Sequence, residues 1–141
     1  MAEETRYERF EGGCLCGLLR YESTAPTADA GYCHCRLCQR SSGAPVLAWG
    51  AFPIDHFAYR KGSPRIYQSS PHARREFCGS CGTQIAFVDT QTPATVDVNL
   101  ATLDVPEAVK PAWHIWTSSR IAWFDTADRL PRYPDDGPAR P

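Results

Sequence analysis

The seven cysteines of this 141-residue chain fall into three tight clusters. They are Cys14 and Cys16, then Cys33, Cys35 and Cys38, and finally Cys78 and Cys81. Zinc in proteins is commonly held by four ligands in a tetrahedron, and thiolates are among its preferred donors. The seven cysteines can therefore be divided into one closed site of four and one site of three that keeps a vacant position. A closed site stabilises a fold, whereas an open site can bind water or a substrate, so the count is compatible with an enzyme.

The spacing of the cysteines also indicates the cellular compartment. Their number is odd, and secreted disulfide frameworks usually pair all of their cysteines. Two cysteines one residue apart on a strand point to the same side, which suits a shared metal better than an unstrained disulfide. Residues 1–20 lack the positive start and apolar stretch of a signal peptide, and no window of about 18 residues is apolar enough to span a membrane. We expect a cytoplasmic protein.

The composition is consistent with one small domain that has a hydrophobic core. Apolar residues make up 43% of the chain and include four Trp, six Tyr and six Phe. Bound metal is expected to supplement the packing of so small a domain. The formal net charge is −1, and a general nucleic-acid binder would need a strong basic excess, so nucleic acid is not an expected partner. We expect a flexible leader at residues 1–10, the zinc domain at 11–130 and a Pro-rich, poorly ordered tail at 131–141.

Short apolar runs separated by Gly and Pro predict a mainly β chain with little helix. Polar and apolar residues alternate in Thr95–Leu100, which is typical of a half-buried strand. Arg36–Ser42 is the best candidate for a helix. Arg74 and Arg75 are expected on an exposed face of a strand. The expected strands are Leu18–Glu22, Val46–Phe52, Arg65–Gln68, Arg74–Phe77, Gln84–Val88 and Thr95–Leu100.

The first and third cysteine clusters together predict a structural metal site. Cys14 and Cys16 are flanked by glycines, which let the backbone turn tightly around a metal. Cys78-Gly79-Ser80-Cys81-Gly82 has the form of a zinc knuckle, whose amides can point at the sulfur atoms. Joined in one tetrahedron, the two pairs would fasten the start of the domain to its middle.

The second cluster predicts a metal site of a different kind. Cys33, Cys35 and Cys38 lie within six residues and can cap one face of a metal, and no cysteine remains to close the site. Three protein ligands and an exchangeable position are typical of catalytic zinc. His34 lies between two cysteines that face the same way, so it is expected to point away from their metal. The alternative is a closed, structural site completed by a histidine. The candidates for that ligand are His34, His56, His72 and His114.

Other residues near the second cluster have two readings each. Arg36 and Arg40 could pair with a carboxylate of a bound substrate, or they could be solvated surface residues. His114 lies between Trp113 and Trp116 and could contact a substrate or ligand, or it could be a hydrogen-bonded core residue. The tryptophans are expected to be mainly in the core, with one or two of them on the wall of a pocket. They are Trp49, Trp113, Trp116 and Trp123.

The order of the cysteine clusters, with two, three and two members, is similar to that of a known protein family. The relevant stretches are GGCLCG at 12–17, CHCRLCQRSSGAP at 33–45, FCGSCGTQI at 77–85 and HIWTSSRIAW at 114–123. With these stretches, the chain resembles the glutathione-dependent formaldehyde-activating family, also called the centromere-protein-V-like family, of zinc proteins. The resemblance runs from about Glu11 to Phe124, and the complete cysteine pattern is far more specific than any single C-x-x-C.

The resemblance implies a β-tent fold of small antiparallel sheets pinned by zinc, with two zinc ions. A structural ion would be held by Cys14, Cys16, Cys78 and Cys81, and a catalytic ion by Cys33, Cys35 and Cys38. The family's named reaction joins formaldehyde to the thiol of glutathione, and the reverse is a carbon–sulfur lyase step. Arg36, Arg40 and His114 are then candidates for binding the thiol substrate. The alternative function is a non-catalytic zinc module that binds a protein partner; the physiological thiol and the oligomeric state stay open.

Overall fold

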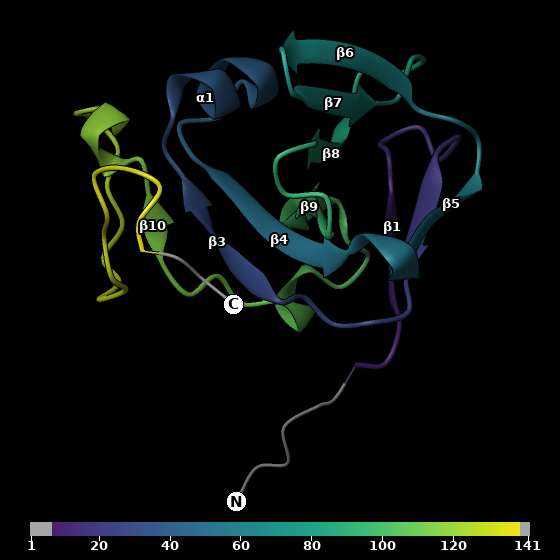
Figure 1. Ribbon diagram of the computed structural model, residues 1–141, viewed down its shortest axis with the longest axis horizontal. Coiled ribbons are helices and arrows are strands. Elements are labelled where there is room, and N and C mark those ends of the chain that lie inside the picture. The colour runs from purple at the N-terminus through teal and green to yellow at the C-terminus, as the bar shows by residue number, and fades with distance from the viewer. Residues whose placement is uncertain (1–6, 139–141) are drawn as a thin grey trace, which may run out of the picture.

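A computed structural model describes residues 7–138, which form two β-sheets, one α-helix and four short 3-10 turns (Figure 1). The larger sheet has the strand order β10-β3-β4-β9-β8-β7-β6, and the smaller sheet has the order β1-β2-β5. The strands are β1 (Phe10–Gly13), β2 (Arg20–Ser23), β3 (Asp29–Cys33), β4 (Leu47–Pro53), β5 (Phe57–Lys61), β6 (Arg65–Ser70), β7 (Ala73–Phe77), β8 (Gln84–Asp89), β9 (Thr95–Asn99) and β10 (His114–Ile115). The prediction of a mainly β fold with little helix is confirmed.

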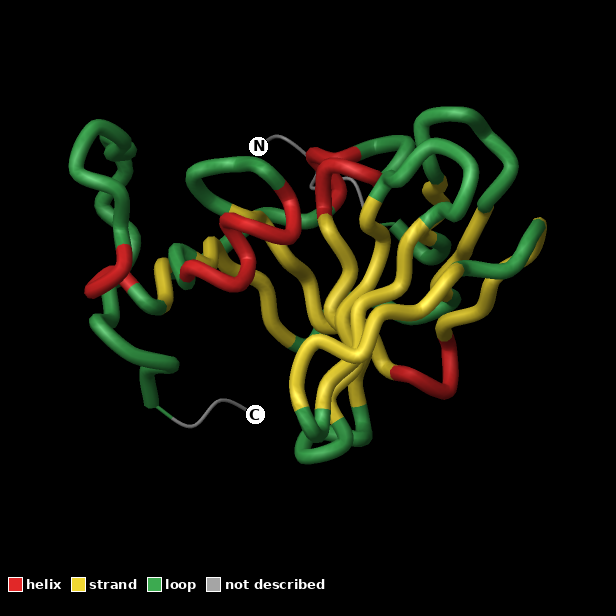
Figure 2. The backbone as a smooth tube through the Cα atoms, turned by 90° about the horizontal axis from the view of Figure 1, so that it is seen from above, coloured by secondary structure: helices red, strands yellow, loops and turns green. Residues whose placement is uncertain are grey.

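Neighbouring strands are antiparallel throughout both sheets, with one exception. The two-residue strand β10 pairs in parallel with the end of β3, so that His114 lies opposite Tyr32 and Ile115 lies opposite Cys33. The tube view shows the strands of the larger sheet running side by side, with the segment after β10 standing off to one side (Figure 2). The parallel pair brings a part of the chain far from β3 in sequence to the edge of the sheet that carries the second cysteine cluster.

The main hydrophobic core joins the two sheets. Phe10 and Tyr21 of the smaller sheet pack in one cluster with Phe52, Val96 and Val98 of the larger sheet. Val96 and Val98 are buried while the residues between and before them are half-buried, as the alternation in that strand predicted. Because successive side chains of a strand point to opposite faces, the other face of the larger sheet is left to line a cavity.

The single α-helix, α1, spans Arg36–Ser42, which is the range expected from the sequence. Cys35 is its N-cap, and the Cys35 sulfur accepts a hydrogen bond from the amide of Cys38. Gly43 ends the helix in the left-handed conformation, with φ of 71°. The helices formed by residues 7–138 include none with the length and apolar character needed to cross a membrane.

The segment from Pro131 to Asp135 lies along β10. The amide of His114 donates to the Pro131 carbonyl at 2.9 Å, and the amide of Tyr133 donates back to the His114 carbonyl at 3.0 Å. The Trp116 amide donates to the Asp135 carbonyl at 2.8 Å. This part of the expected tail is thus hydrogen-bonded to the domain. Residues 1–6 of the expected leader and 139–141 of the expected tail lie outside the described residues, and the domain boundaries stay predictions.

Candidate metal centres and the adjoining cavity

The four-cysteine cluster is built from two loops that the two sheets present to each other. Cys14 and Cys16 follow β1 of the smaller sheet, and Cys78 and Cys81 follow β7 of the larger one. The four sulfur atoms all lie within 4.8 Å of one another. The Cys14–Cys16 sulfur distance is 3.5 Å and the Cys16–Cys78 distance is 3.8 Å. A tetrahedron with zinc–sulfur bonds of about 2.3 Å has sulfur–sulfur edges of about 3.8 Å, so this donor set fits a tetrahedral metal.

Hydrogen bonds to sulfur favour the thiolates of Cys14 and Cys81. The Leu19 amide donates to the Cys14 sulfur at 3.2 Å. The Thr83 hydroxyl lies 3.2 Å from the Cys81 sulfur, and this contact is the largest cause of a lowered pKa of Cys81, to about 5. Gly82, with φ of 80°, closes the turn by donating its amide to the Cys78 carbonyl at 2.8 Å. This left-handed conformation favours glycine, which explains the residue that follows the second cysteine of the knuckle.

The three-cysteine cluster lies at the junction of β3 and α1. Cys33 ends the strand, Cys35 caps the helix and Cys38 lies in its first turn. The three sulfur atoms lie within 4.8 Å of one another, and within residues 7–138 no histidine or carboxylate joins this group. Hydrogen bonding by Cys33 first, and then by Cys38, lowers the pKa of Cys35, so the first thiolate of the cluster forms there. The donor set fits a metal with three protein ligands and one further position.

His34 points away from the cysteines that flank it and enters a buried hydrogen-bonded chain. Its Nε2 lies 2.8 Å from Nδ1 of His114, and Nε2 of His114 lies 3.0 Å from the Asp128 carboxylate. Because Asp128 can only accept while ionised, the network assigns the Nε2 proton of His114 to that bond and leaves Nδ1 of His114 to accept from His34. Burial lowers the pKa of His34 to about 4, so the ring is neutral at pH 7.

His114 is therefore placed in the interior, as the second of its two sequence readings proposed. Its side chain is fully buried, and its ring stacks on Tyr32 with centroids 4.8 Å apart. The other two histidines belong to neither cysteine cluster. His56 is hydrogen-bonded to Thr24, and His72, which lines the cavity described below, is hydrogen-bonded to Asp89.

A cavity of about 730 Å³ opens beside the three-cysteine cluster, and all three cysteines line it. Its floor is the face of the larger sheet opposite the core. Strand register places Arg75 opposite Phe87 and Phe87 opposite Asp97, and the same row continues through Ala51 to Asp29. Directly opposed residues share a face of a sheet, and all five residues of this row line the cavity.

The tryptophans are less uniformly buried than expected. Trp49 is buried and Trp113 is half-buried, but Trp116 and Trp123 are exposed. Trp49 and Trp116 line the cavity, which agrees with the expectation that one or two tryptophans would wall a pocket. The expectation that the remaining ones lie in the core was wrong for Trp123, whose exposed fraction is 78%.

Among residues 7–138, the arginine that lines the cavity is not one of those selected from the sequence. Arg36 and Arg40 are exposed on α1, and neither lines the cavity. Arg75 does line it, with only 6% of its surface exposed, so the expectation that Arg75 lies on an exposed strand face was wrong. Arg74 keeps a half-exposed position and pairs with Glu76 at 3.1 Å. The alternation of side chains along a strand could have revealed this difference. Arg74 and Arg75 are adjacent, so their side chains point to opposite faces of the sheet and cannot both face solvent when one face is covered.

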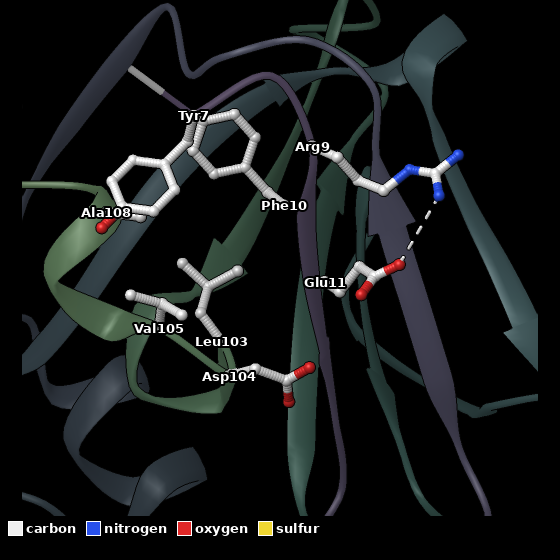
Figure 3. Close-up of a pocket in the computed structure, with 8 residues that line it drawn as sticks. All are labelled: Tyr7, Arg9, Phe10, Glu11, Leu103, Asp104, Val105 and Ala108. Carbon is white, nitrogen blue, oxygen red and sulfur yellow. Dashed lines mark ion pairs between the residues drawn. The ribbon is translucent and has the colours of Figure 1, made fainter. Parts of the chain in front are cut away.

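Figure 3 shows a second, smaller hollow in the protein. Its volume is about 150 Å³, and no cysteine lines it. Tyr7, Phe10 and Leu103 supply an apolar wall, and Arg9 forms an ion pair with Glu11 at 3.8 Å at its rim. The hollow combines no nucleophile or metal-ligating set, so the larger cavity is the candidate functional site.

A mainly β scaffold with a four-cysteine cluster and a three-cysteine cluster beside a cavity defines a class of proteins whose cysteine clusters could hold metal ions. The chain belongs to the family described as glutathione-dependent formaldehyde-activating enzyme, whose family model matches residues 9–119.

Two similar proteins illustrate the family relationship. A Schizosaccharomyces pombe protein named as an uncharacterized lyase is 28% identical over 81 residues, which cover 57% of this chain and 58% of that protein. The chain thus matches less than two thirds of the length of this curated relative. The crystal structure of a Rhodobacter sphaeroides protein superimposes with a TM-score of 0.54 at 28% identity, covering 72% of this chain and 91% of that one. The structural match supports the same fold.

Proposed function

We propose that the protein is a zinc-dependent carbon–sulfur lyase-like enzyme that forms or cleaves an adduct between a small thiol, such as glutathione, and an aldehyde, such as formaldehyde. The observation that carries this proposal is the convergence of three cysteine sulfurs on one end of a cavity of about 730 Å³. The family to which the chain belongs and the lyase name of the yeast relative support it.

Two zinc ions with different duties are part of the proposal. A structural ion would be held by Cys14, Cys16, Cys78 and Cys81, because their four sulfur atoms lie within 4.8 Å of one another and can supply all four ligands of a tetrahedral zinc. Cys33, Cys35 and Cys38 would hold the second ion and leave one position toward the cavity. When bound there, zinc supplies a positive charge that favours a thiolate and polarises a carbonyl oxygen.

The chemistry itself is balanced without a further reactant. In the forward direction the thiol sulfur bonds to the aldehyde carbon, and the proton of the thiol is transferred to the carbonyl oxygen. With glutathione and formaldehyde the product is S-hydroxymethylglutathione, and the lyase direction breaks the same carbon–sulfur bond. Leu47, Trp49 and Ile115 provide apolar wall next to the cysteines. These apolar side chains exclude water from the cavity and thereby strengthen the electrostatic interactions of the reacting groups.

Metal counting and a thiol titration test this function. We expect two zinc ions per chain, one of which is readily removed by a chelator. In cobalt-substituted protein the absorption reports sulfur ligation, and glutathione should change the spectrum of one metal only, with the four-cysteine metal as an internal control. Cys35→Ser should abolish the change.

An unchanged spectrum at millimolar glutathione would contradict the glutathione assignment. Two metals that equally resist chelation, together with no response to any thiol, would favour the alternative of a non-catalytic module that binds a protein partner. The cytoplasmic location and the lack of a nucleic-acid partner stay predictions from the sequence.

A further inference from the structure

Arg75 is a buried cation whose position the metal clusters do not explain. Its exposed fraction is 6%, and its guanidinium lies over the ring of Phe87, 4.9 Å from the centroid. With the Gln84 amide turned so that its oxygen faces Arg75, this oxygen accepts from Nη1 at 3.1 Å, and the amide nitrogen donates to the Ser41 carbonyl at 3.0 Å. Both contacts hold the guanidinium in place, but Phe87 and Gln84 are uncharged and do not neutralise it.

Arg75 and the thiols share one cavity. Arg75 lines the cavity together with all three cysteines of the second cluster. A buried charge is costly unless it is paired, and arginine presents a planar fork of donors that matches a carboxylate. The guanidinium of Arg75 is therefore suited to bind an anion that enters the cavity.

We propose that Arg75 binds a carboxylate of the substrate and thereby selects carboxylate-bearing thiols. This inference rests on the proposed function, because it assigns the specificity of the same cavity. A thiol whose sulfur lies at Cys33, Cys35 and Cys38 extends its remaining atoms over the floor of the sheet, where Arg75 lies in the row that also contains Asp97 and Asp29. Arg75 is the cationic member of this five-residue row, so it also sets the direction in which a carboxylate-bearing thiol lies.

A matched pair of thiols tests the inference. 3-Mercaptopropionate and its amide have nearly the same shape, and only the first carries a carboxylate. In cobalt-substituted protein we expect the acid to bind about ten- to a hundredfold more tightly than the amide, which corresponds to one charge-assisted hydrogen-bonded pair. Arg75→Gln should reduce the affinity for the acid to that for the amide. Equal affinities in the parent protein, or a preference that survives in Arg75→Gln, would overturn the inference.

Two further variants separate recognition from folding. Arg74→Gln removes the neighbouring charge on the opposite face of β7 and should keep the preference for the acid. Arg75→Lys keeps a positive charge but lacks the fork, so it should show an intermediate preference and a melting temperature near that of the parent. If Arg74→Gln loses the preference as completely as Arg75→Gln does, the effect is structural and the inference is wrong.

The carboxylate could in principle enter with the aldehyde instead of the thiol. Turnover of glyoxylate and of formaldehyde, each with 2-mercaptoethanol, distinguishes these sources. Dependence on Arg75 that appears only with glyoxylate would assign the carboxylate to the aldehyde and overturn the selection of thiols.

A thiol-free ligand separates failure of this inference from failure of the proposed function. Calorimetry with 3-(methylthio)propionate measures carboxylate binding that does not require a free thiol. Binding that is lost in Arg75→Gln supports the carboxylate site even if no thiol changes the cobalt spectrum, a result that would contradict only the proposed chemistry. If Arg75→Gln keeps both the calorimetric binding and the thiol-induced change of the cobalt spectrum, the inference is overturned and the proposed chemistry is not.

Discussion

Asp128 is the outer end of the buried chain that runs through His114 to His34, and it decides how the protons of that chain are placed. Its carboxylate accepts from Nε2 of His114 at 3.0 Å and from the Leu130 amide at 3.0 Å. Hydrogen bonding by Thr126 is the largest cause of the lowered pKa of Asp128, about 2. The ionised form is therefore favoured in the folded protein, and this one side chain couples the segment after β10 to the strand that carries Cys33.

The Asp128→Asn variant tests this coupling through its pH dependence. A carboxyl group whose pKa is lower in the folded than in the unfolded state stabilises the fold above its unfolded pKa of about 3.9, and this contribution is lost as the pH falls toward 2. Asp128→Asn should therefore melt at a lower temperature than the parent at pH 7, with the gap narrowing between pH 4 and pH 2. Thermal melts of both proteins across this pH range measure the difference in melting temperature. A difference that does not change with pH would contradict a lowered pKa of Asp128 in the folded protein.

Cys35 is the N-cap of α1, and we propose that its sulfur is also a metal ligand. Serine is a good N-cap, so Cys35→Ser should keep the helix while it removes one ligand of the second cluster. We expect the variant to lose one metal ion per chain and to retain its far-ultraviolet circular dichroism. Metal analysis and circular dichroism of the same sample check both parts. A global loss of structure would mean that the three-cysteine cluster is structural.

At the scale of elements, the sequence predicted those parts whose signal is local. The helix was expected at Arg36–Ser42, directly after Cys35, and the alternation in Thr95–Leu100 predicted the strand that became β9. The strands β1, β3, β5 and β10 were not predicted. β3 contains Gly31 at its centre and β10 has two residues, so neither shows an alternating pattern, and their pairing depends on contacts between segments about 80 positions apart.

Gly31 shows why β3 cannot carry an ordinary strand residue at its centre. A Cβ atom at this position would lie 2.6 Å from the Trp113 ring, 3.0 Å from the Trp113 carbonyl oxygen and 3.1 Å from the Trp49 ring. Backbone and indole cannot move aside easily, so Gly31→Ala should destabilise the protein by about 1–3 kcal/mol through overpacking. Chemical denaturation measures this free energy.

Gly50→Ala on β4 is the matched comparison for that substitution. Its Cβ would meet the end of the Leu100 side chain at 2.7 Å and the Thr27 methyl group at 2.9 Å, and both are side-chain atoms that can shift. We expect a smaller loss of stability than at Gly31. The reverse order would show that the approach of Trp113 to β3 does not limit the packing there.

At the scale of the whole molecule, the four-cysteine cluster joins the two sheets across a sequence separation of 62 residues between Cys16 and Cys78. The cysteine spacing alone predicted that the first and third clusters lie together, because the number and spacing of zinc ligands can be recognised without knowing the fold. The cavity was not foreseeable in the same way. Which of Arg74 and Arg75 faces it depends on which face of the larger sheet the core covers, and that follows from the packing of the two sheets.

Cys14→Ser and Cys78→Ser should each remove cooperative folding. Binding of a structural zinc contributes roughly 10 kcal/mol or more, and typical domain stabilities are about 5–15 kcal/mol, so the remaining contacts are not expected to hold the sheets together. Thermal melts and metal counts on both variants test this expectation. Cooperative melting within a few degrees of the parent would contradict the structural role of the cluster.

The parallel pair between β10 and β3 has a consequence for local opening. Only two residue pairs form it, and two amides on the β3 side donate across it, from Tyr32 to the Trp113 carbonyl and from His34 to the Ile115 carbonyl. Short edge segments can detach without global unfolding, and amide hydrogen exchange reports such events. The Tyr32 and His34 amides should therefore exchange with solvent sooner than the amides that join β4 to β9. Their exchange rates would measure how often β10 detaches from β3 and moves Ile115 and Trp116 away from the cavity.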